Sequence, residues 1–297
     1  MTTEKNTNTP LKPLCLLALA VSLTGCTDNH QDEYDALYPI TVQACVSGSN
    51  TRLESGSIKD LSLFVFDRNY RFMYKIETGT GKEITIRKPV GESLHIVTWG
   101  NLAEGAQTLT EPKPGDRPDA CLVELQPRVR TSVPPCAGSP GDLFRGEITL
   151  SDNERDGEKK LSIYREVGSM TVTLQNLENC PGYDDGNFRL TVHETHSMMN
   201  FKGELQGDMI AYLPAGSIDG KRYCTPPFNM FPGESVRISI HHGDRHIATV
   251  SADRRGEPIT VERDRLTKVL IDLETASSVT ADVEVAGWMR YEMEKEF

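Results

Sequence analysis

The sequence predicts an all-β protein made of two antiparallel β-sandwiches in tandem. From Tyr38 onward, short runs of alternating apolar and polar residues recur, with turn residues about every 8–12 positions. No segment has the apolar periodicity of an amphipathic helix of three turns. The 24 Gly and 17 Pro suit a fold with many turns, and 297 residues leave room for two sandwiches of ordinary size.

The composition excludes two classes of protein. The formal net charge is −11, and a negative field repels phosphate backbones, so we expect no nucleic-acid partner. Hydrophobic residues make up only 37% of the chain, which argues against a membrane protein with several spans.

Residues 1–25 have the features of a bacterial signal peptide. Lys5 and Lys12 precede an apolar stretch from Leu14 to Leu23, which is too short to span a bilayer. The stretch ends in Leu23-Thr24-Gly25-Cys26, which resembles the lipobox of bacterial lipoproteins. That resemblance implies cleavage before Cys26 and diacylation of its thiol, and acyl chains would then form the membrane anchor. The alternative is an ordinary signal peptide followed by an incidental cysteine.

Residues 26–36 are polar and acidic and predict a flexible tether. This stretch is similar to the acidic export signal that sends some lipoproteins of the Bacteroidetes to the outer face of the outer membrane. The expected location is therefore the cell outer membrane, surface-exposed and lipid-anchored.

Residues 37–155 are expected to form the N-terminal sandwich. Residues 40–46 alternate as a half-buried strand does, and 61–67 would pair with 71–76 in a hairpin. Further strands are expected at 84–86 and 94–99. The segment 103–142 is rich in proline and is predicted to be mostly loop, with a short strand at 122–125.

Residues 156–297 are expected to form the C-terminal sandwich, because the charged stretch 151–160 marks a junction. The predicted strands of this half are 161–167, 170–177, 188–192, 209–213, 236–240, 246–250, 266–273 and 279–285.

The order of these features resembles the FimB-like fimbrial anchor subunits, lipoproteins of the fimbrillin superfamily found in Bacteroidetes-type fimbriae. The resemblance rests on the lipobox, the 61–67 hairpin, His95–Leu102, Tyr164–Val172 and the terminal Val283-Glu284-Val285-x-Gly287-Trp288. It covers nearly the whole mature chain, although each motif alone is only a patterned strand with an aromatic end.

The resemblance implies two transthyretin-like domains and assembly by donor-strand exchange with fimbrial stalk subunits. An anchor subunit would sit at the base of the fimbria, hold it to the outer membrane and limit its length. The family implies no enzymatic activity and no cofactor.

The terminal segment 279–297 has the form of a donated strand. Val279, Ala281, Val283 and Val285 alternate with polar residues, and Trp288 follows. Donated strands add main-chain hydrogen bonds and fill pockets with alternate side chains. The alternative is that this segment is the last strand of its own sheet.

Two other functions stay open. Stalk subunits of this superfamily are cut after an early Arg or Lys, and Arg52 follows the first predicted strand. We predict that Arg52 is not processed; processing there would make the chain a stalk or accessory subunit. A glycan-binding β-sandwich lipoprotein would need an exposed aromatic platform, and the sequence has only Trp99 and Trp288 as tryptophans.

No motif predicts a catalytic residue or a metal site. His193 and His196 are three residues apart in a strand pattern and lack the spacing of a zinc helix. His241 and His246 flank a Gly243-Asp244 turn and would face each other across a hairpin, where metal capture or pH sensitivity is the less favoured interpretation. The acidic loops lack the twelve-residue spacing of a calcium loop.

Five cysteines remain in the expected mature chain besides Cys26: Cys45, Cys121, Cys136, Cys180 and Cys224. An odd number in an exported protein leaves at least one unpaired. A bridge between Cys121 and Cys136 and free buried thiols are both compatible with the sequence.

Overall fold

The computed structural model describes residues 36–53, 56–79, 84–129, 135–154, 157–180, 182–183, 186–275 and 278–288. The chain divides into residues 1–34 and 35–297, and all of the described residues belong to the second part. Its described residues form β-strands and one short 3-10 helix, η1 (Leu177–Asn179), so the all-β prediction is confirmed. No helix in the described ranges has the length and apolar character needed to cross a bilayer.

Sheet 1 contains seven strands in the order β3-β2-β5-β10-β11-β1-β4. Their bounds are β1 (Ala36–Cys45), β2 (Asp60–Phe66), β3 (Phe72–Gly79), β4 (Ile84–Lys88), β5 (Leu94–Gly100), β10 (Phe144–Leu150) and β11 (Lys159–Arg165). β1 pairs in parallel with β11 and antiparallel with β4.

Sheet 2 has the path β15-β16-β12-β20-β21, with β17 also paired to β12. Its strands are β12 (Gly168–Gln175), β15 (Ser217–Asp219), β16 (Arg222–Cys224), β17 (Phe228–Met230), β20 (Arg265–Thr275) and β21 (Ser278–Gly287).

Sheet 3 has the path β19-β18-β13-β14-β9-β8, and β7 pairs with both β13 and β6. Its strands are β6 (Gln107–Leu109), β7 (Leu122–Leu125), β8 (Pro127–Val129), β9 (Cys136–Ala137), β13 (Phe188–Asn200), β14 (Leu205–Tyr212), β18 (Arg237–His242) and β19 (Arg245–Val250).

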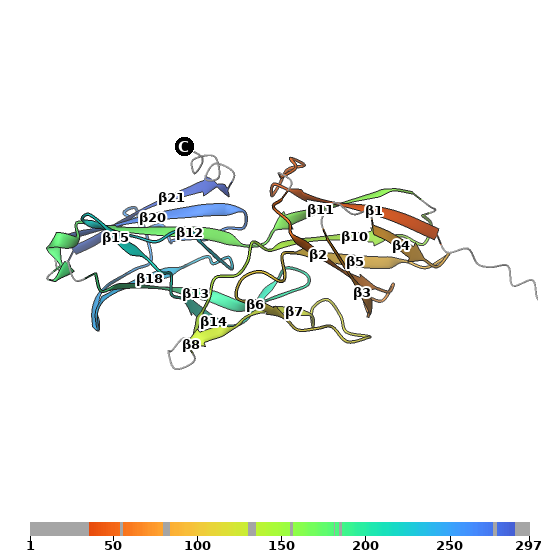
Figure 1. The fold of residues 1–297 in the computed structure, drawn as a ribbon, viewed down its shortest axis with the longest axis horizontal. Helices are drawn as coiled ribbons and strands as arrows, with labels where there is room; N and C mark the ends of the chain where they lie inside the picture. Colours follow the sequence, from red (N-terminus) through yellow and green to blue (C-terminus); the bar gives the residue numbers. More distant parts are fainter. Residues whose placement is uncertain are drawn as a thin grey trace, which may run out of the picture. The chain divides into compact units, whose positions relative to one another are not determined.

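Sheets 2 and 3 pack face to face as a sandwich. In Figure 1, β12, β20 and β21 form one layer and β13 and β18 run in the other. Val172 and Ile271 of sheet 2 share a hydrophobic cluster with Leu190 and Ile238 of sheet 3, and all four are fully buried. Alternate residues of these strands face inward, as the sequence pattern predicted.

Sheet 1 is buried on both faces at β2. One face, with Leu63 and Val65, joins a core of its own that includes Tyr38. The other face, with Phe64 and Phe66, belongs to the cluster of sheets 2 and 3. The run Leu61–Phe66 is therefore continuously buried, which explains why its sequence is apolar without alternation except at Ser62.

Strand pairing crosses the junction expected near residue 155. β11 lies after the charged stretch, yet it pairs with β1 and β10 in sheet 1. Strands β6 to β9 precede the stretch, yet they belong to sheet 3. The residue-level division into 37–155 and 156–297 stays a prediction.

Candidate functional site

The terminal strand β21 forms one edge of sheet 2. It pairs antiparallel with β20 along its length, and Val283 lies opposite Val269. On the face predicted from the sequence, Ala281 is buried and Val279 and Val283 are half-buried, whereas Val285 is 44% exposed. In this structure β21 therefore stays in its own sheet, which was the alternative left open by the sequence.

Arg254 covers part of the outer edge of β21. Its backbone N–H donates to the carbonyl of Ala281 at 2.9 Å. Its guanidinium donates to the Thr280 hydroxyl at 3.1 Å and lies 3.6 Å from an Asp282 carboxylate oxygen. Towards Gly287, no strand pairs with this edge among the residues the structure describes. An unpaired strand edge can accept another strand.

Trp288, which follows β21, contacts an arginine of sheet 1 through a cation–π interaction. The guanidinium carbon of Arg165, at the end of β11, lies 4.1 Å from the Trp288 ring centroid. Arg165 is 2% exposed and donates to both carboxylate oxygens of Asp142, at 2.5 and 2.9 Å. A third bond, from Nη1 to Asp264 Oδ1, is 2.5 Å long. The backbone N–H of Ser47 also donates to Asp264, at 2.8 Å.

Burial and charge oppose each other in this cluster. Burial raises the pKa of Asp142, and the hydrogen bonds and charge of Arg165 only partly offset the shift. Burial alone would lower the pKa of Arg165, but the two carboxylates raise it above its ordinary value. Arg165 therefore keeps its charge in the interior and holds the carboxylates around it.

The first strand, β1, lies inside sheet 1 between β11 and β4. Tyr38 and Ile40 are fully buried. After β1 the chain turns back on itself. Val46 N–H donates to Thr51 O at 2.9 Å, and the backbone of Arg52 forms an isolated antiparallel β-bridge with that of Cys45. Arg52 is exposed, but its neighbouring backbone is hydrogen-bonded to the end of β1.

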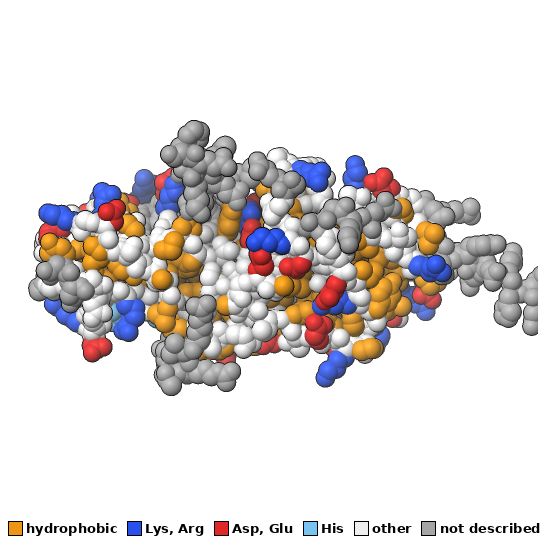
Figure 2. Space-filling model, in the orientation of Figure 1, with side chains coloured by type: hydrophobic (Ala, Val, Ile, Leu, Met, Phe, Trp, Pro, Cys, Tyr) orange, Lys and Arg blue, Asp and Glu red, His pale blue; other side chains and the backbone are white. Residues whose placement is uncertain are grey.

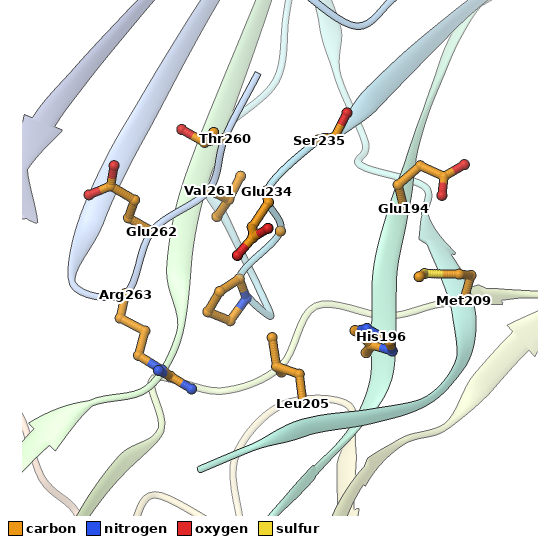
Figure 3. A pocket seen from close by; sticks show the side chains of 12 residues that line it. Glu194, His196, Leu205, Met209, Glu234, Ser235, Thr260, Val261, Glu262 and Arg263 are labelled. Atoms are coloured by element: carbon orange, nitrogen blue, oxygen red, sulfur yellow. The ribbon is translucent and has the colours of Figure 1, made fainter. Parts of the chain in front are cut away.

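A cavity of about 880 Å³ opens beside β13, among Glu194, His196, Glu234, Glu262 and Arg263. Figure 3 shows Glu262 and Arg263 on one side, Glu194, His196 and Met209 on the other, and Glu234 between them. The sequence did not single out this cavity as a site, because its walls come from segments far apart in the chain.

The exposed large apolar side chains of the described residues come from several different strands and loops, and they do not identify a site by themselves. Val285 and Met209 are each 44% exposed. On the face drawn in Figure 2, hydrophobic side chains form separate groups with charged residues between them. Scattered apolar residues of this kind are normal on soluble proteins.

The histidine pairs are not assembled into a metal centre. A β-bulge at Glu194 separates His193, which contacts the Ser239 hydroxyl at 3.2 Å, from His196, which contacts the Gly207 carbonyl at 3.1 Å. His241 and His246 do face each other across the β18–β19 hairpin, as predicted, with ring centroids 5.2 Å apart. Within the described ranges no group of three or more His, Cys, Asp or Glu side chains could hold a metal ion.

The five described cysteines are free thiols. All are buried except Cys224, which is half-buried. Burial, with Asp116 and Asp119 nearby, raises the pKa of Cys121 to about 12. Of the two possibilities for Cys121 and Cys136, the structure contains the free thiols and no bridge.

Two predicted features lie outside the described residues: Cys26 with residues 27–35 of its tether, and the tail 289–297. Ala36, the last residue of the predicted tether, is the first residue of β1. Asp184 and Asp185, which belong to an acidic loop between η1 and β13, also lie outside them.

The fold and the edge strand define a class of protein: an all-β protein whose sandwich has a terminal strand at the edge of one sheet. A family model described as fimbrillin-A associated anchor proteins Mfa1 and Mfa2 matches residues 19–293. The chain therefore belongs to this family of fimbrial anchor proteins, which confirms the resemblance drawn from the sequence. It is 21% identical over 304 residues to the major fimbrium anchoring subunit FimB of Porphyromonas gingivalis, across 92% of this chain and 93% of that protein.

Solved structures share the fold. The fimbrial anchor protein Mfa2 from Porphyromonas gingivalis superposes with a TM-score of 0.56 at 12% identity, over 85% of this chain and 97% of that chain. A protein from Bacteroides thetaiotaomicron, described as a candidate polysaccharide-binding protein, superposes with a TM-score of 0.65 at 13% identity, over 86% of this chain and 97% of that chain. At these identities the likeness concerns the fold alone.

Proposed function

We propose that this protein is an outer-membrane lipoprotein that anchors a fimbria to the cell surface and ends its polymer. Membership of the fimbrial anchor family is the observation that carries the proposal. Acyl chains at Cys26 would hold the base in the membrane, and the acidic residues 27–35 that precede β1 would separate the folded part from the bilayer.

The partner in this proposal is a fimbrial stalk subunit, joined by β-strand addition at β21. Val279, Ala281, Val283 and Val285 would supply the apolar face of the donated strand, and Trp288 its aromatic end. The position of β21 supports this role, because β20 is its one strand partner among the described residues, and on the outer side only the contacts of Arg254 with Thr280, Ala281 and Asp282 would have to break. Main-chain bonds lost to β20 would be replaced by bonds in the partner.

A first strand that is not removed by cleavage would explain how the polymer ends at this subunit. If Arg52 is not cut, β1 stays between β11 and β4, and sheet 1 offers no vacant position to another subunit's strand. The hydrogen-bonded turn around Arg52 supports this, since proteases bind extended chain. N-terminal sequencing of the mature protein tests it: we expect no product starting at Leu53, and such a product would make the chain a stalk subunit.

The membrane attachment is tested by substituting Cys26→Ala. We expect the variant to leave the membrane fraction and appear in the soluble fraction. Retention equal to that of the unsubstituted protein would contradict lipidation at Cys26. The proposal includes no catalytic step and no cofactor.

A further inference from the structure

One end of sheet 1 is formed by the beginning of β1 together with two of its turns (Figure 1). Ala36, the first residue of β1, lies opposite Lys88, the last residue of β4. From there the β4–β5 turn leads into β5, where His95 lies opposite Phe66, the last residue of β2. The β4–β5 and β2–β3 turns are therefore at the same end of the sheet as Ala36. We call this the Ala36 end of sheet 1.

Most of the exposed apolar side chains of the described residues lie at the Ala36 end. Eight large apolar side chains are well exposed, and five of them, between 38% and 51% exposed, belong to this end: Leu37, Tyr70, Met73, Tyr74 and Val90. One follows Ala36, one lies in the β4–β5 turn, and three lie in the β2–β3 turn or at the start of β3. Single exposed apolar residues need no explanation, but a group of five around one end of a sheet does.

The β2–β3 turn holds Tyr70 in a fixed position. The Asp67 carboxylate accepts hydrogen bonds from the N–H groups of Asn69 and Arg71, at 2.7 and 2.9 Å. Tyr70 N–H donates to the Asp67 carbonyl at 2.9 Å, and its φ is 58°. The Tyr70 ring stacks on the His95 ring, with centroids 3.8 Å apart. Tyr70 is thus held by the turn and by one ring face while it stays 44% exposed.

The β4–β5 turn holds Val90 outward in a similar way. The Lys88 side chain is fully buried, and its ammonium donates to the Glu92 carbonyl at 2.8 Å. Glu92 N–H donates to the Pro89 carbonyl at 3.2 Å, and Gly91 has a φ of 78°. Because these bonds close the turn beneath it, Val90 lies at the tip and is 51% exposed.

The exposed charges at the Ala36 end are of both signs. Those in the described residues include Arg68, Arg71, Arg87, Glu92, Asp152 and Glu158. A surface with such mixed charges has no strong attraction for a partner of one sign. A contact made here would therefore depend mainly on burial of the apolar side chains.

The position of Cys26 indicates which partner this end can meet. Ten residue steps of at most about 3.6 Å separate Cys26 from Ala36, so the two are no more than about 36 Å apart. With acyl chains at Cys26 in the bilayer, Ala36 lies within that distance of the lipid surface. A short tether raises the effective concentration of the surface, so that a weak affinity suffices for contact.

We propose that the Ala36 end of sheet 1 is a membrane-contacting surface. The side chains that enter the headgroup region of the bilayer are Leu37, Tyr70, Met73 and Val90. Apolar side chains gain free energy by insertion there, and tyrosine is enriched at membrane–water interfaces. The inference rests on the proposed attachment at Cys26, to which it adds a second contact that orients the folded part on the membrane.

The test uses a chemical attachment at Cys26, so that it does not depend on lipidation in the cell. The full chain with Cys15→Ala and Cys224→Ser is coupled through Cys26 to phosphatidylcholine vesicles that contain a maleimide lipid. The four other described thiols are buried and should not react.

Quenching by brominated phosphatidylcholine then reports contact with the bilayer. Tyr70→Trp places a fluorophore at the proposed contact, and the matched control is Val285→Trp, because Tyr70 and Val285 are both 44% exposed. After subtraction of the signal of Trp99 and Trp288, we expect at least about twofold stronger quenching for Tyr70→Trp than for Val285→Trp. Equal quenching of the two variants would overturn the proposal.

A second measurement removes apolar side chains from the contact. Met73→Asp combined with Val90→Asp, in the Tyr70→Trp protein, replaces exposed side chains, so we expect an unchanged melting temperature and at least about twofold weaker quenching. The matched control is Met209→Asp with Leu213→Asp, which changes side chains that are 44% and 40% exposed elsewhere and should quench as before. Full quenching in the first double variant would contradict insertion of these residues.

Salt distinguishes apolar insertion from attraction between charges. We expect quenching of the Tyr70→Trp protein to change by less than about twofold between about 0.05 and 0.5 M NaCl, whereas charge attraction would be screened. Loss of quenching at high salt would refute the proposal. Absence of quenching on vesicles rejects this surface alone, and membrane retention of Cys26→Ala in cells rejects the proposed attachment, so the two failures are distinguishable.

Discussion

Arg165 and Asp264 form a buried ion pair that joins sheet 1 to sheet 2. Arg165 Nη1 lies 2.5 Å from Asp264 Oδ1, and their side chains are 1% and 4% exposed. Arg165 ends β11, whereas Asp264 precedes β20 and has a φ of 57°. Through Trp288, which stacks on the same guanidinium, the end of β21 contacts this pair as well.

The first prediction concerns the stability that depends on this pair. Arg165→Ala leaves the Asp264 carboxylate buried without its cation, and breaking a buried pair in this way costs about 3–5 kcal/mol. We expect a loss of that order in the free energy of unfolding, measured by urea denaturation. Arg255→Ala is the matched control, because Arg255 is exposed and forms no ion pair in the described part of the chain. It should change stability by about 0.5 kcal/mol or less.

The Arg165→Lys variant distinguishes the contribution of the positive charge at residue 165 from that of its forked hydrogen bonds. Lysine keeps the positive charge but cannot donate to Asp142 through two nitrogens while also reaching Asp264. We expect a stability between those of the unsubstituted protein and Arg165→Ala. A Lys variant as stable as the unsubstituted protein would show that the forked hydrogen bonds contribute nothing.

The second prediction tests whether β21 leaves its sheet during assembly. Lys268 and Glu284 are opposite each other in the β20–β21 register, and cysteines at both positions would lock the strands together. If β21 is the donated strand, the oxidised double variant should reach the cell surface but hold no fimbriae. The two single-cysteine variants are the controls. Normal fimbriation of cells in which the disulfide between positions 268 and 284 has formed would exclude donation of β21.

Much of the secondary structure could be predicted from local pattern. The hairpin expected from 61–67 and 71–76 is β2 and β3, and the strand expected at 279–285 is β21. The Gly243-Asp244 turn connects β18 and β19 as expected. These elements are local, so alternation and turn residues suffice to specify them.

Pairing between distant strands could not be predicted in the same way. The parallel pairing of β11 with β1 joins residues more than 100 positions apart, and no local pattern encodes it. The same holds for the cavity beside β13, which depends on a bulge at Glu194 and on Val236 pairing with Ile259. A bulge changes register without changing composition, so the sequence contained no signal for it.

The third prediction is that stability falls on mild acidification. Burial and Arg237 lower the pKa of His193, and burial, Arg189 and His246 lower the pKa of His241. In the unfolded chain both titrate near a pKa of about 6.5. Below that pH the unfolded state takes up protons that the folded state does not, so unfolding becomes more favourable.

Urea denaturation at pH 7.5 and pH 5.5 measures this effect. We expect a lower free energy of unfolding at pH 5.5, and a smaller drop in a variant carrying His193→Gln and His241→Gln. An identical drop in both proteins would assign the pH dependence to other groups.

The fourth prediction concerns the thiols. In the folded Cys26→Ala protein at pH 8, alkylation followed by mass spectrometry should find Cys224 modified first, because it is half-buried. Cys121 should be modified last, because burial raises its pKa to about 12 and little thiolate is present. In denaturant without reductant all five should react. Protection of Cys121 and Cys136 under those conditions would reveal a bridge between them.

The most direct test of anchoring is a deletion strain complemented with either the unsubstituted gene or the Cys26→Ala variant. Electron microscopy and quantification of fimbriae in the cell and medium fractions give the readout. We predict long or detached fimbriae in the medium for the deletion and for Cys26→Ala, and cell-bound fimbriae of normal length with the unsubstituted protein. Cell-bound fimbriae of unchanged length in the deletion strain would contradict the anchoring function.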